Sequence, residues 1–433
     1  MYSDTTPNIR IQPSKGCPVA TVTIDDLVSP VLTPLQLQLI ANAEEAPVDL
    51  DPDELLAEAS KATGLGDFGS DDFRPRLDMY VSAINADDGC NNLNRMTLRR
   101  RIIRLLSQRL LFNDLLQRHP EIHGIEIERP LVVVGLPRSG TTHLVNLLAS
   151  DPRRRALPYW ESQEPFPLPG EGPGVDGVDP RYARCATSHQ QAGALLPFMA
   201  AMHDRFPSAI EEEVEIQDLD FSSYVLEWHA RVPAWRDHYL TLDQTQHYAY
   251  LRTVLQALTF LRGPRQWVLK SPQHCEQLGP LLATFPDATF AFTHRDPVAV
   301  IQSAVTMLAY GDRMRRHAID PDDLADYWID RIEMLLRSCV RDRHLIPPEQ
   351  SLDIAFHELN GHEMDILDQL YRLNGTDLTE PVRTAFNAYL NSNPRGSKGR
   401  MRYRLHEDFG RSPDEVRARF DFYFDRFNVK KES

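Results

Sequence analysis

The chain has 433 residues, of which 42% are hydrophobic and 25% are charged, and its formal net charge is −15. This composition is typical of a globular protein with one large domain or two smaller ones, and the negative charge argues against general nucleic-acid binding. No apolar run reaches the length of a membrane span, and no signal-peptide core follows the first residues. We therefore expect a cytoplasmic protein without a membrane span.

The cysteines are scattered along the chain without any Cys-x-x-Cys pair. They are Cys17, Cys90, Cys185, Cys275 and Cys339. This spacing predicts neither a zinc site nor a disulfide framework, so buried free thiols are expected.

The N-terminal part of the chain indicates a polar arm followed by a helical region. Residues 1–30 are polar and contain several prolines, which predicts an N-terminal arm of uncertain order. Residues 31–125 contain two clear helices, one from the cap Asp51 to the stop signal Gly64 and one over 93–117 with an apolar stripe. Arginines on the second helix predict a solvated face, with contact to an anionic partner as the alternative: Arg99, Arg100, Arg101, Arg104 and Arg109.

A short strand, a glycine-bracketed turn and a helix follow one another in the next segment. Leu131–Val134 is an unbroken apolar run, typical of a strand buried on both faces. Gly135 and Gly140 bracket a turn where the backbone can approach a ligand closely, and helical spacing of apolar residues begins at Thr141. The helix N-terminus then offers free N–H groups and the positive end of its dipole, which predicts an anion site.

The spacing of the two glycines is that of a nucleotide triphosphatase P-loop, but Thr141 stands where that motif requires lysine. Triphosphate cleavage then lacks its usual electrostatic partner, whereas Arg138 can still clamp one anionic group. The sequence Pro137-Arg138-Ser139-Gly140-Thr141-Thr142 resembles the 5′-phosphosulfate loop of PAPS-dependent sulfotransferases, in the branch that carries arginine where many cytosolic members have lysine. The resemblance implies that these six residues bind the donor 3′-phosphoadenosine 5′-phosphosulfate (PAPS).

Three further strand–turn–helix units follow, with strands expected over Trp267–Leu269, Ala288–Thr293 and Leu352–Phe356. Strands that alternate with helices predict a parallel sheet covered on both faces. We therefore expect an α/β protein, with a P-loop-like three-layer fold and a central parallel sheet over residues 126–433, to which the helical N-terminal region is added. Ligands of such sheets bind beyond the carboxyl ends of the strands.

The resemblance implies a second phosphate site. Arg295 and Ser303 match the family's ligands for the 3′-phosphate, and a guanidinium fork with a hydroxyl suits phosphate oxygens. The alternative is that Arg295 pairs with a surface carboxylate. The basic glycine loop over 393–404 is similar to a family loop that touches the same phosphate, with Lys398 and Arg400 as candidate contacts. Its residue order departs from the cytosolic version, so which cation makes the contact is left open.

The resemblance also implies catalytic residues. Lys270 matches a lysine that offsets charge on the bridging oxygen as the sulfur–oxygen bond breaks. The acceptor proton requires a base, and Glu161 holds the position of the glutamate that the arginine branch uses. Glu212, Glu213 and His229 are the rival bases, although an acidic run such as 211–213 is typical of a solvated helix face.

The expected reaction is in-line transfer of a sulfuryl group from PAPS to a hydroxyl of a small-molecule alcohol or phenol. No metal is expected, because arginine and lysine take the role that Mg²⁺ has in kinases. The alternatives are a small-molecule kinase that uses ATP and a non-catalytic nucleotide-binding protein. Four aromatic residues either line an acceptor pocket or belong to the core, and a homo-oligomer is left open: Trp160, Trp228, Trp235 and Tyr239.

Overall fold

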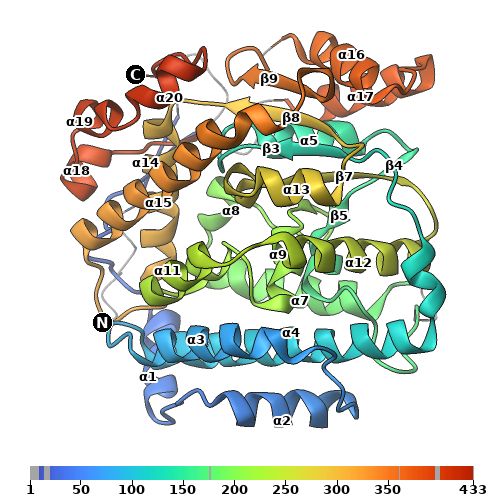
Figure 1. The fold of residues 1–433 in the computed structure, drawn as a ribbon. Coiled ribbons are helices and arrows are strands. Elements are labelled where there is room, and N and C mark those ends of the chain that lie inside the picture. Colours follow the sequence, from blue (N-terminus) through green and yellow to red (C-terminus); the bar gives the residue numbers. More distant parts are fainter. Residues whose placement is uncertain (1–8, 14–19, 175–176, 360, 395–399, 433) are drawn as a thin grey trace.

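The computed structural model describes residues 9–13, 20–174, 177–359, 361–394 and 400–432. Its central element is a five-stranded sheet of parallel strands in the order β4-β7-β3-β8-β9. The strands are β3 (Leu131–Val134), β4 (Arg154–Arg155), β7 (Gln266–Ser271), β8 (Thr289–His294) and β9 (Ser351–Ala355). Helices cover both faces of this sheet (Figure 1), which confirms the predicted α/β class and parallel sheet.

The alternation of side chains along β3 explains why both faces are covered. Leu131 and Val133 belong to the core of one face, whereas Val132 and Val134 belong to the core of the other. The helices on the first face are α5 (Thr141–Ala149), α16 (Glu363–Asn374) and α17 (Glu380–Ser392). Those on the second are α12 (Thr245–Arg262), α13 (Leu278–Thr284), α14 (Pro297–Asp312) and α15 (Pro321–Asp342).

Four N-terminal helices form a further layer at the bottom of Figure 1. They are α1 (Pro34–Glu44), α2 (Pro52–Thr63), α3 (Arg74–Asn85) and α4 (Asn92–Arg118). Asp51 caps α2, and Gly64 ends it with a φ of 72°, as predicted. Leu98 and Ile102 of α4 belong to the same continuous core as the sheet residue Val132. The N-terminal layer therefore packs as part of one hydrophobic core, and a domain boundary near residue 125 stays a prediction.

The arginines of α4 differ from the expected solvated face. Arg101 forms ion pairs with Glu215, at 2.9 Å, and with Asp218, and both carboxylates are buried. Arg109 lies 2.9 Å from the buried carboxylate of Asp220. The prediction of a solvated face is therefore wrong for these two arginines, because a later acidic segment of the chain covers this side of α4.

The segment between β4 and α12 fills the space between the sheet and the N-terminal layer (Figure 1). Its elements are β5 (Leu157–Pro158), α6 (Tyr159–Gln163), α7 (Pro180–Leu195), α8 (Met199–Met202), β6 (Ile210–Glu211), α9 (Val214–Gln217), α10 (Leu226–His229) and α11 (Pro233–Thr241). Leu157 of β5 pairs antiparallel with Glu211 of β6. The acidic run 211–213 therefore begins in a strand, and the expectation of a solvated helix face is wrong.

The N-terminal strands pair with a strand from the last part of the chain in a small sheet. Its strands are β1 (Ile9–Pro13), β2 (Ala20–Ile24) and β10 (Arg400–Met401), with β1 antiparallel and β10 parallel to β2. Three helices follow, namely α18 (Leu405–Phe409), α19 (Pro413–Ala418) and α20 (Asp421–Arg426). Short 3₁₀ turns complete the fold at Asp71–Phe73, Pro120–Gly124, Asp218–Asp220, Pro272–Glu276, Arg343–Leu345 and Pro348–Gln350. Parts of the predicted arm thus belong to a sheet.

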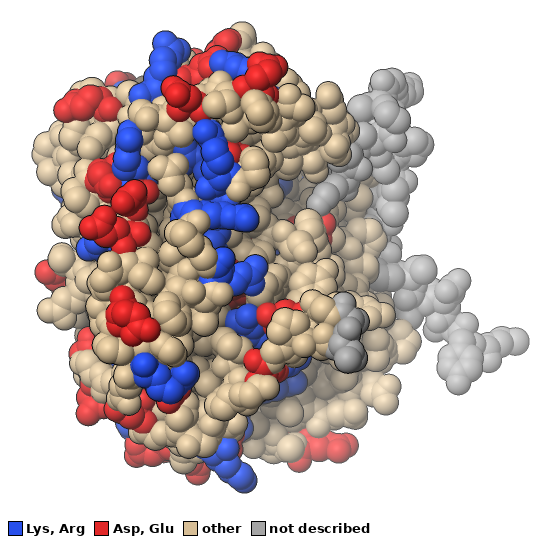
Figure 2. All heavy atoms as spheres, turned by 90° about the vertical axis from the view of Figure 1, so that its right-hand side faces the viewer, with Lys and Arg blue, Asp and Glu red and all other residues tan. Residues whose placement is uncertain are grey.

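The surface charge is unevenly spread. Figure 2 shows lysine and arginine side chains gathered in a band down one face, although the net charge of the chain is −15. The four described cysteines are buried free thiols, as expected: Cys90, Cys185, Cys275 and Cys339. Among the described residues, no helix combines the length and apolar character that crossing a bilayer requires.

Replacement of Arg331 tests the buried charges of the core. Arg331 lies on α15 with 0% of its side chain exposed, and it pairs with Glu227 at 2.8 Å and with Glu276 at 2.7 Å. Arg331→Met leaves two buried carboxylates without their cation and should lower the free energy of unfolding by about 3–5 kcal/mol in urea titrations. Arg337→Met on the same helix removes an exposed pair with Glu333 and should change it by less than about 1 kcal/mol. Equal losses in the two variants would contradict this account.

Candidate active site

The loop between β3 and α5 is held in a strained, compact shape. Arg138 and Gly140 both have positive φ angles, of 67° and 93°. A Cβ atom on Gly140 would lie 2.6 Å from Cδ1 of Leu359, and one on Gly135 would lie 2.1 Å from Oγ1 of Thr293. Gly140 therefore suits both the positive φ of the turn and the close packing, whereas Gly135 is required for the close packing. The predicted strand–glycine loop–helix unit is present.

Ser139 has a different place from the other loop residues. Its hydroxyl donates to the carbonyl oxygen of Leu136 at 2.6 Å and shares a 2.7 Å hydrogen bond with the hydroxyl of Thr293 on β8. The side chain is buried and does not line the cavity described next. Ser139 thus ties the loop to the neighbouring strand, and only its backbone remains available to an anion.

The loop borders a cavity of about 220 Å³, which we call the loop cavity. Its lining residues are Pro137, Arg138, Gly140, Thr141, Thr142, His203, Glu212, Trp228, Arg295, Ala304, Met307 and Phe356. The structure thus brings five of the six predicted loop residues together with Arg295. Lys270, Ser303 and Glu161 do not line this cavity.

Arg295 follows the carboxyl end of β8 and is fixed from several sides. Its Nη1 donates to the backbone carbonyl of Arg138 at 2.6 Å, and its guanidinium lies 4.0 Å from the centre of the Phe356 ring. Its Nε and Nη2 each lie 2.7 Å from a carboxylate oxygen of Glu432. Ser303 is buried on α14, next to the lining residue Ala304. The described chain therefore places a carboxylate on the guanidinium that was expected to bind phosphate.

Glu212 is the carboxylate that faces the loop cavity. Nζ of Lys270 lies 2.5 Å from its Oε1, and Lys270 is almost fully buried behind it. Burial raises the pKa of Glu212, and the neighbouring charge of Glu211 adds to the rise, whereas Lys270 opposes it. For Glu211 the burial effect is outweighed by Arg205 and His203, which hold its pKa at about 2. Of these two neighbouring carboxylates, Glu212 is the better proton acceptor.

Glu213, the residue after Glu212, uses both of its carboxylate oxygens in contacts within the protein. One carboxylate oxygen lies 2.5 Å from Nε2 of His274, and the other accepts a 2.7 Å hydrogen bond from the backbone N–H of Lys270. Both oxygens are engaged, and the side chain is buried away from the loop cavity. Glu213 therefore links β7 to the acidic segment.

The structure gives Glu161 a position that differs from the expectation. Its carboxylate is buried, 2.9 Å from Arg155 and 3.4 Å from Arg262, and it does not line the loop cavity. The reason is that α6 turns this residue toward the two arginines, while the paired strand β6 carries Glu212 to the loop. The geometry thus favours Glu212 over Glu161 as the base.

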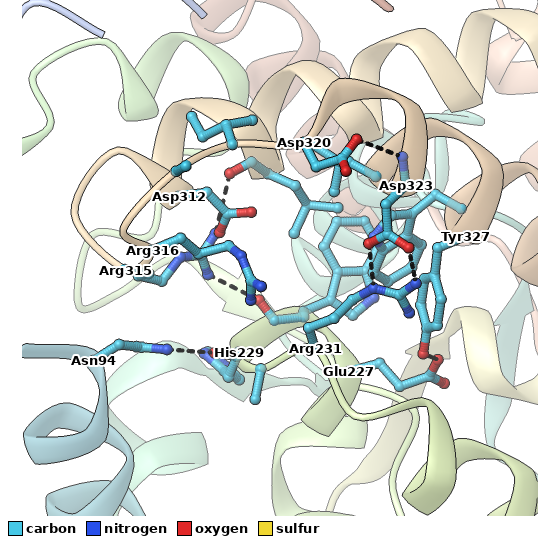
Figure 3. Close-up of a pocket in the computed structure, with 17 residues that line it drawn as sticks. Asn94, Glu227, His229, Arg231, Asp312, Arg315, Arg316, Asp320, Asp323 and Tyr327 are labelled. Carbon is cyan, nitrogen blue, oxygen red and sulfur yellow. Dashed lines mark hydrogen bonds and ion pairs between the residues drawn. The ribbon is translucent and has the colours of Figure 1, made fainter. Parts of the chain in front are cut away.

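His229 lies in a separate, small pocket of about 70 Å³ (Figure 3). Asn94 donates to its backbone carbonyl, and nearby Arg231 is paired with Asp323. Burial and the positive charge of Arg101 hold the pKa of the imidazole well below its usual range, so it is neutral. Its pocket is separated from the loop by Trp228, which lines both spaces.

The basic segment after residue 393 does not reach the loop cavity in its described part. Arg400 is exposed in β10, and Arg404 pairs with Asp25 and Asp408 at 2.8 and 2.7 Å. Lys398 lies outside the described residues.

Sequence patterns gave no signal for His203, which lines the loop cavity from the irregular segment after α8. Phe356 was within reach of prediction, because it follows β9 at the edge where the parallel strands end. No group of three His, Cys, Asp or Glu side chains in the described part of the chain is arranged to hold a metal ion.

Residues 130–380 match the model of a family described as the sulfotransferase family. The omega-hydroxy-beta-dihydromenaquinone-9 sulfotransferase Stf3 of Mycobacterium bovis is 25% identical over 253 residues, which are 56% of this chain and 62% of that protein's length. The structure of sulfotransferase STF1 from Mycobacterium tuberculosis H37Rv has a TM-score of 0.75 and 27% identity, over 86% of this chain and 98% of its own. The fold is also that of STF9 from Mycobacterium avium, with a TM-score of 0.78, 24% identity, and coverage of 89% and 100%.

Replacement of Gly135 tests the packing of the loop. In Gly135→Ala the new methyl group would lie 2.1 Å from Oγ1 and 2.9 Å from the backbone oxygen of Thr293, so the loop must shift. We expect a loss of about 1–3 kcal/mol in the free energy of unfolding, measured in urea. Gly193→Ala on α7 adds the same methyl group where nothing lies within 4 Å, and it should be neutral or stabilising. An unchanged stability of Gly135→Ala would refute the close contact.

Proposed function

The chain belongs to the sulfotransferase family, and from this premise we propose that it transfers a sulfuryl group from PAPS to a hydroxyl of a small-molecule alcohol or phenol. The observation that carries the proposal is the loop cavity, where a glycine-bracketed loop, a helix N-terminus, Arg138, Arg295 and Glu212 converge. The relative named for an omega-hydroxylated dihydromenaquinone supports a small-molecule alcohol as acceptor. A cytoplasmic location stays a prediction, with which the free cysteines are compatible.

The loop suits a single phosphate that carries a transferable group. Gly140 leaves no room for a Cβ atom, and Thr141 and Thr142 open α5 with their backbone N–H groups. We assign the 5′-phosphate of the donor to the backbone of 137–142, with Arg138 and Thr142 at the cavity. When bound, PAPS supplies an activated sulfuryl group whose bond to the phosphate oxygen breaks as the acceptor oxygen bonds to sulfur.

The 3′-phosphate is assigned to Arg295, with Ser303 as a second donor. The guanidinium already holds a carboxylate with two parallel hydrogen bonds, which is the geometry that a phosphate would use in its place. Glu432 must give way for this contact. A contribution from Lys398 or Arg400 stays a prediction.

Glu212 is assigned as the base in place of Glu161. Its Oε atoms accept the proton of the acceptor hydroxyl while that oxygen forms its bond to sulfur, so no proton is left on the product ester. Lys270 positions the carboxylate through the 2.5 Å ion pair. Its predicted second task, to offset negative charge on the leaving oxygen together with Arg138, also stays a proposal.

Nucleotide binding tests the assignment of Arg295. Arg295→Gln should weaken binding of 3′,5′-adenosine bisphosphate by about 10- to 100-fold in isothermal titration calorimetry, because a charge-assisted fork is lost. Binding of adenosine 5′-monophosphate, which lacks the 3′-phosphate, should change much less. The exposed Arg372→Gln is the matched surface control and should bind both nucleotides normally. Tighter binding of ATP than of the bisphosphate by the unaltered protein would favour a kinase and contradict the proposal.

Kinetics test the choice of base. An acceptor is first identified by mass shift from a panel of hydroxylated lipids, phenols, sterols and sugars. Glu212→Gln should then lower kcat by about 10²–10⁴-fold, with binding of 3′,5′-adenosine bisphosphate retained. Because the base must be ionised and burial raises its pKa, kcat/KM should fall with decreasing pH below a pKa that lies above the usual glutamate range, and stay constant above it.

Glu161→Gln is the comparison variant. When its activity is divided by the measured number of nucleotide-binding sites, Glu161→Gln should keep most of the activity of the unaltered protein, because the carboxylate of Glu161 pairs with Arg155 and Arg262. The assignment fails if Glu161→Gln loses activity and Glu212→Gln retains it.

A further inference from the structure

A second cavity, of about 310 Å³, lies beside the loop cavity; we call it the side cavity. It is bordered by α6, α7 and α8, and His203 lines both cavities. Resting on the proposed function, we propose that the side cavity holds the acceptor and that Arg104 binds an anionic group of it. The acceptor is then a hydroxylated molecule with an apolar body and an acidic group remote from the reacting hydroxyl.

The walls of the side cavity suit an apolar body. Tyr159, Trp160, Leu196 and Met199 line it. Its volume is at the lower end of the range for small-molecule sites, which are mostly apolar with a few polar groups that fix orientation. A molecule lying along these side chains would have its reacting end at His203. His203 also lines the loop cavity, as Glu212 does.

Most charged groups around the side cavity already neutralise one another. Glu164 is paired with Arg184, whose Nε lies 2.9 Å from a carboxylate oxygen. Arg205 lies 3.3 Å from Glu211 and 3.2 Å from Glu215. The carboxylates of Glu164, Glu211 and Glu215 are therefore all paired with arginines and are not available to attract a cationic acceptor.

Arg104 differs from these paired arginines. It comes from α4 and lines the side cavity, and its buried Nε has no hydrogen-bond partner among the described residues. The nearby Glu215 is engaged by Arg101 and Arg205. Burial and the positive charge of Arg101 lower the pKa of Arg104, and this effect outweighs the opposite influence of Tyr159, Glu215 and Glu164. An anionic ligand group would supply the missing partner.

The position of Arg104 gives the N-terminal helical layer a role in substrate selection. The loop and Arg295 follow strands of the central sheet and Glu212 follows β6, whereas Arg104 is contributed by α4. The acceptor would thus lie between the N-terminal layer and the donor site, with its ends fixed by groups from both.

Matched pairs of acids and esters test the proposal. The probes are 12-hydroxydodecanoic acid and 4-(4-hydroxyphenyl)butanoic acid, each beside its methyl ester, with binding measured by calorimetry in the presence of 3′,5′-adenosine bisphosphate. At least one acid should bind about tenfold or more tightly than its ester, because only the acid pairs with the guanidinium. Arg104→Gln should remove this preference and leave ester binding unchanged. Arg100→Gln, an exposed arginine one turn earlier on α4, should preserve it.

Filling the side cavity is the second test. Gly193 lines the cavity, and an added Cβ atom there meets nothing within 4 Å, so Gly193→Leu is chosen as the cavity-filling variant. It should weaken binding of both the acid and the ester at least tenfold and leave the affinity for the bisphosphate unchanged. Thr187→Leu, exposed on the same helix, should leave all three affinities unchanged.

The outcomes separate the two proposals. Equal binding of acid and ester, an acid preference that survives Arg104→Gln, or no binding of either acid at millimolar concentration would overturn the acceptor proposal while bisphosphate binding persists. Failure of the unaltered protein to bind the bisphosphate would instead overturn the proposed function.

Discussion

The compensation of buried negative charge is the constraint on which the rest of the structure depends. Segment 211–220 carries six carboxylates into the space between the sheet and the N-terminal helices, and each has a cationic or histidine partner. Lys270 and His274 come from the sheet side, and Arg101 and Arg109 from α4. Unpaired, such charges would be too costly to bury. The two layers are therefore fixed to each other by charge as well as by their common apolar core.

Glu212 is the residue of this cluster that we propose as the base. Its neighbours Glu211 and Glu213 are almost fully buried, whereas Glu212 retains an exposed side that reaches the loop cavity. The ion pair with Lys270 fixes its position, and burial raises its pKa. A group held in this way can exchange a proton with a ligand without moving, which is how preorganised sites lower the cost of proton transfer.

The parts of the fold that local rules determine were predictable from the sequence. The run Leu131–Val134, the glycines at 135 and 140 and the cap Asp51 each act through their immediate neighbours, and the structure has them where expected. The site residues depend on pairings between distant segments. Glu161 is the expected base because it matches the position of the glutamate that the arginine branch of the resembled family uses. The antiparallel pairing of Leu157 with Glu211 instead brings Glu212, about fifty positions later in the chain, to the loop cavity. No local pattern at 211–213 reveals that pairing.

On the proposed assignment of the 3′-phosphate to Arg295, the contact between Glu432 and Arg295 makes nucleotide binding an exchange process. An incoming phosphate does not meet a bare guanidinium; it displaces a tethered carboxylate whose effective concentration is set by the fold, with Glu432 itself held by hydrogen bonds to Asp296 and Arg417. The apparent affinity for any anion at this site is reduced by the free energy of that internal pair. Added salt weakens both the Arg295–Glu432 ion pair and the contact between Arg295 and a bound phosphate. The net effect of salt on nucleotide affinity is therefore smaller than at a site whose arginine has no internal carboxylate partner.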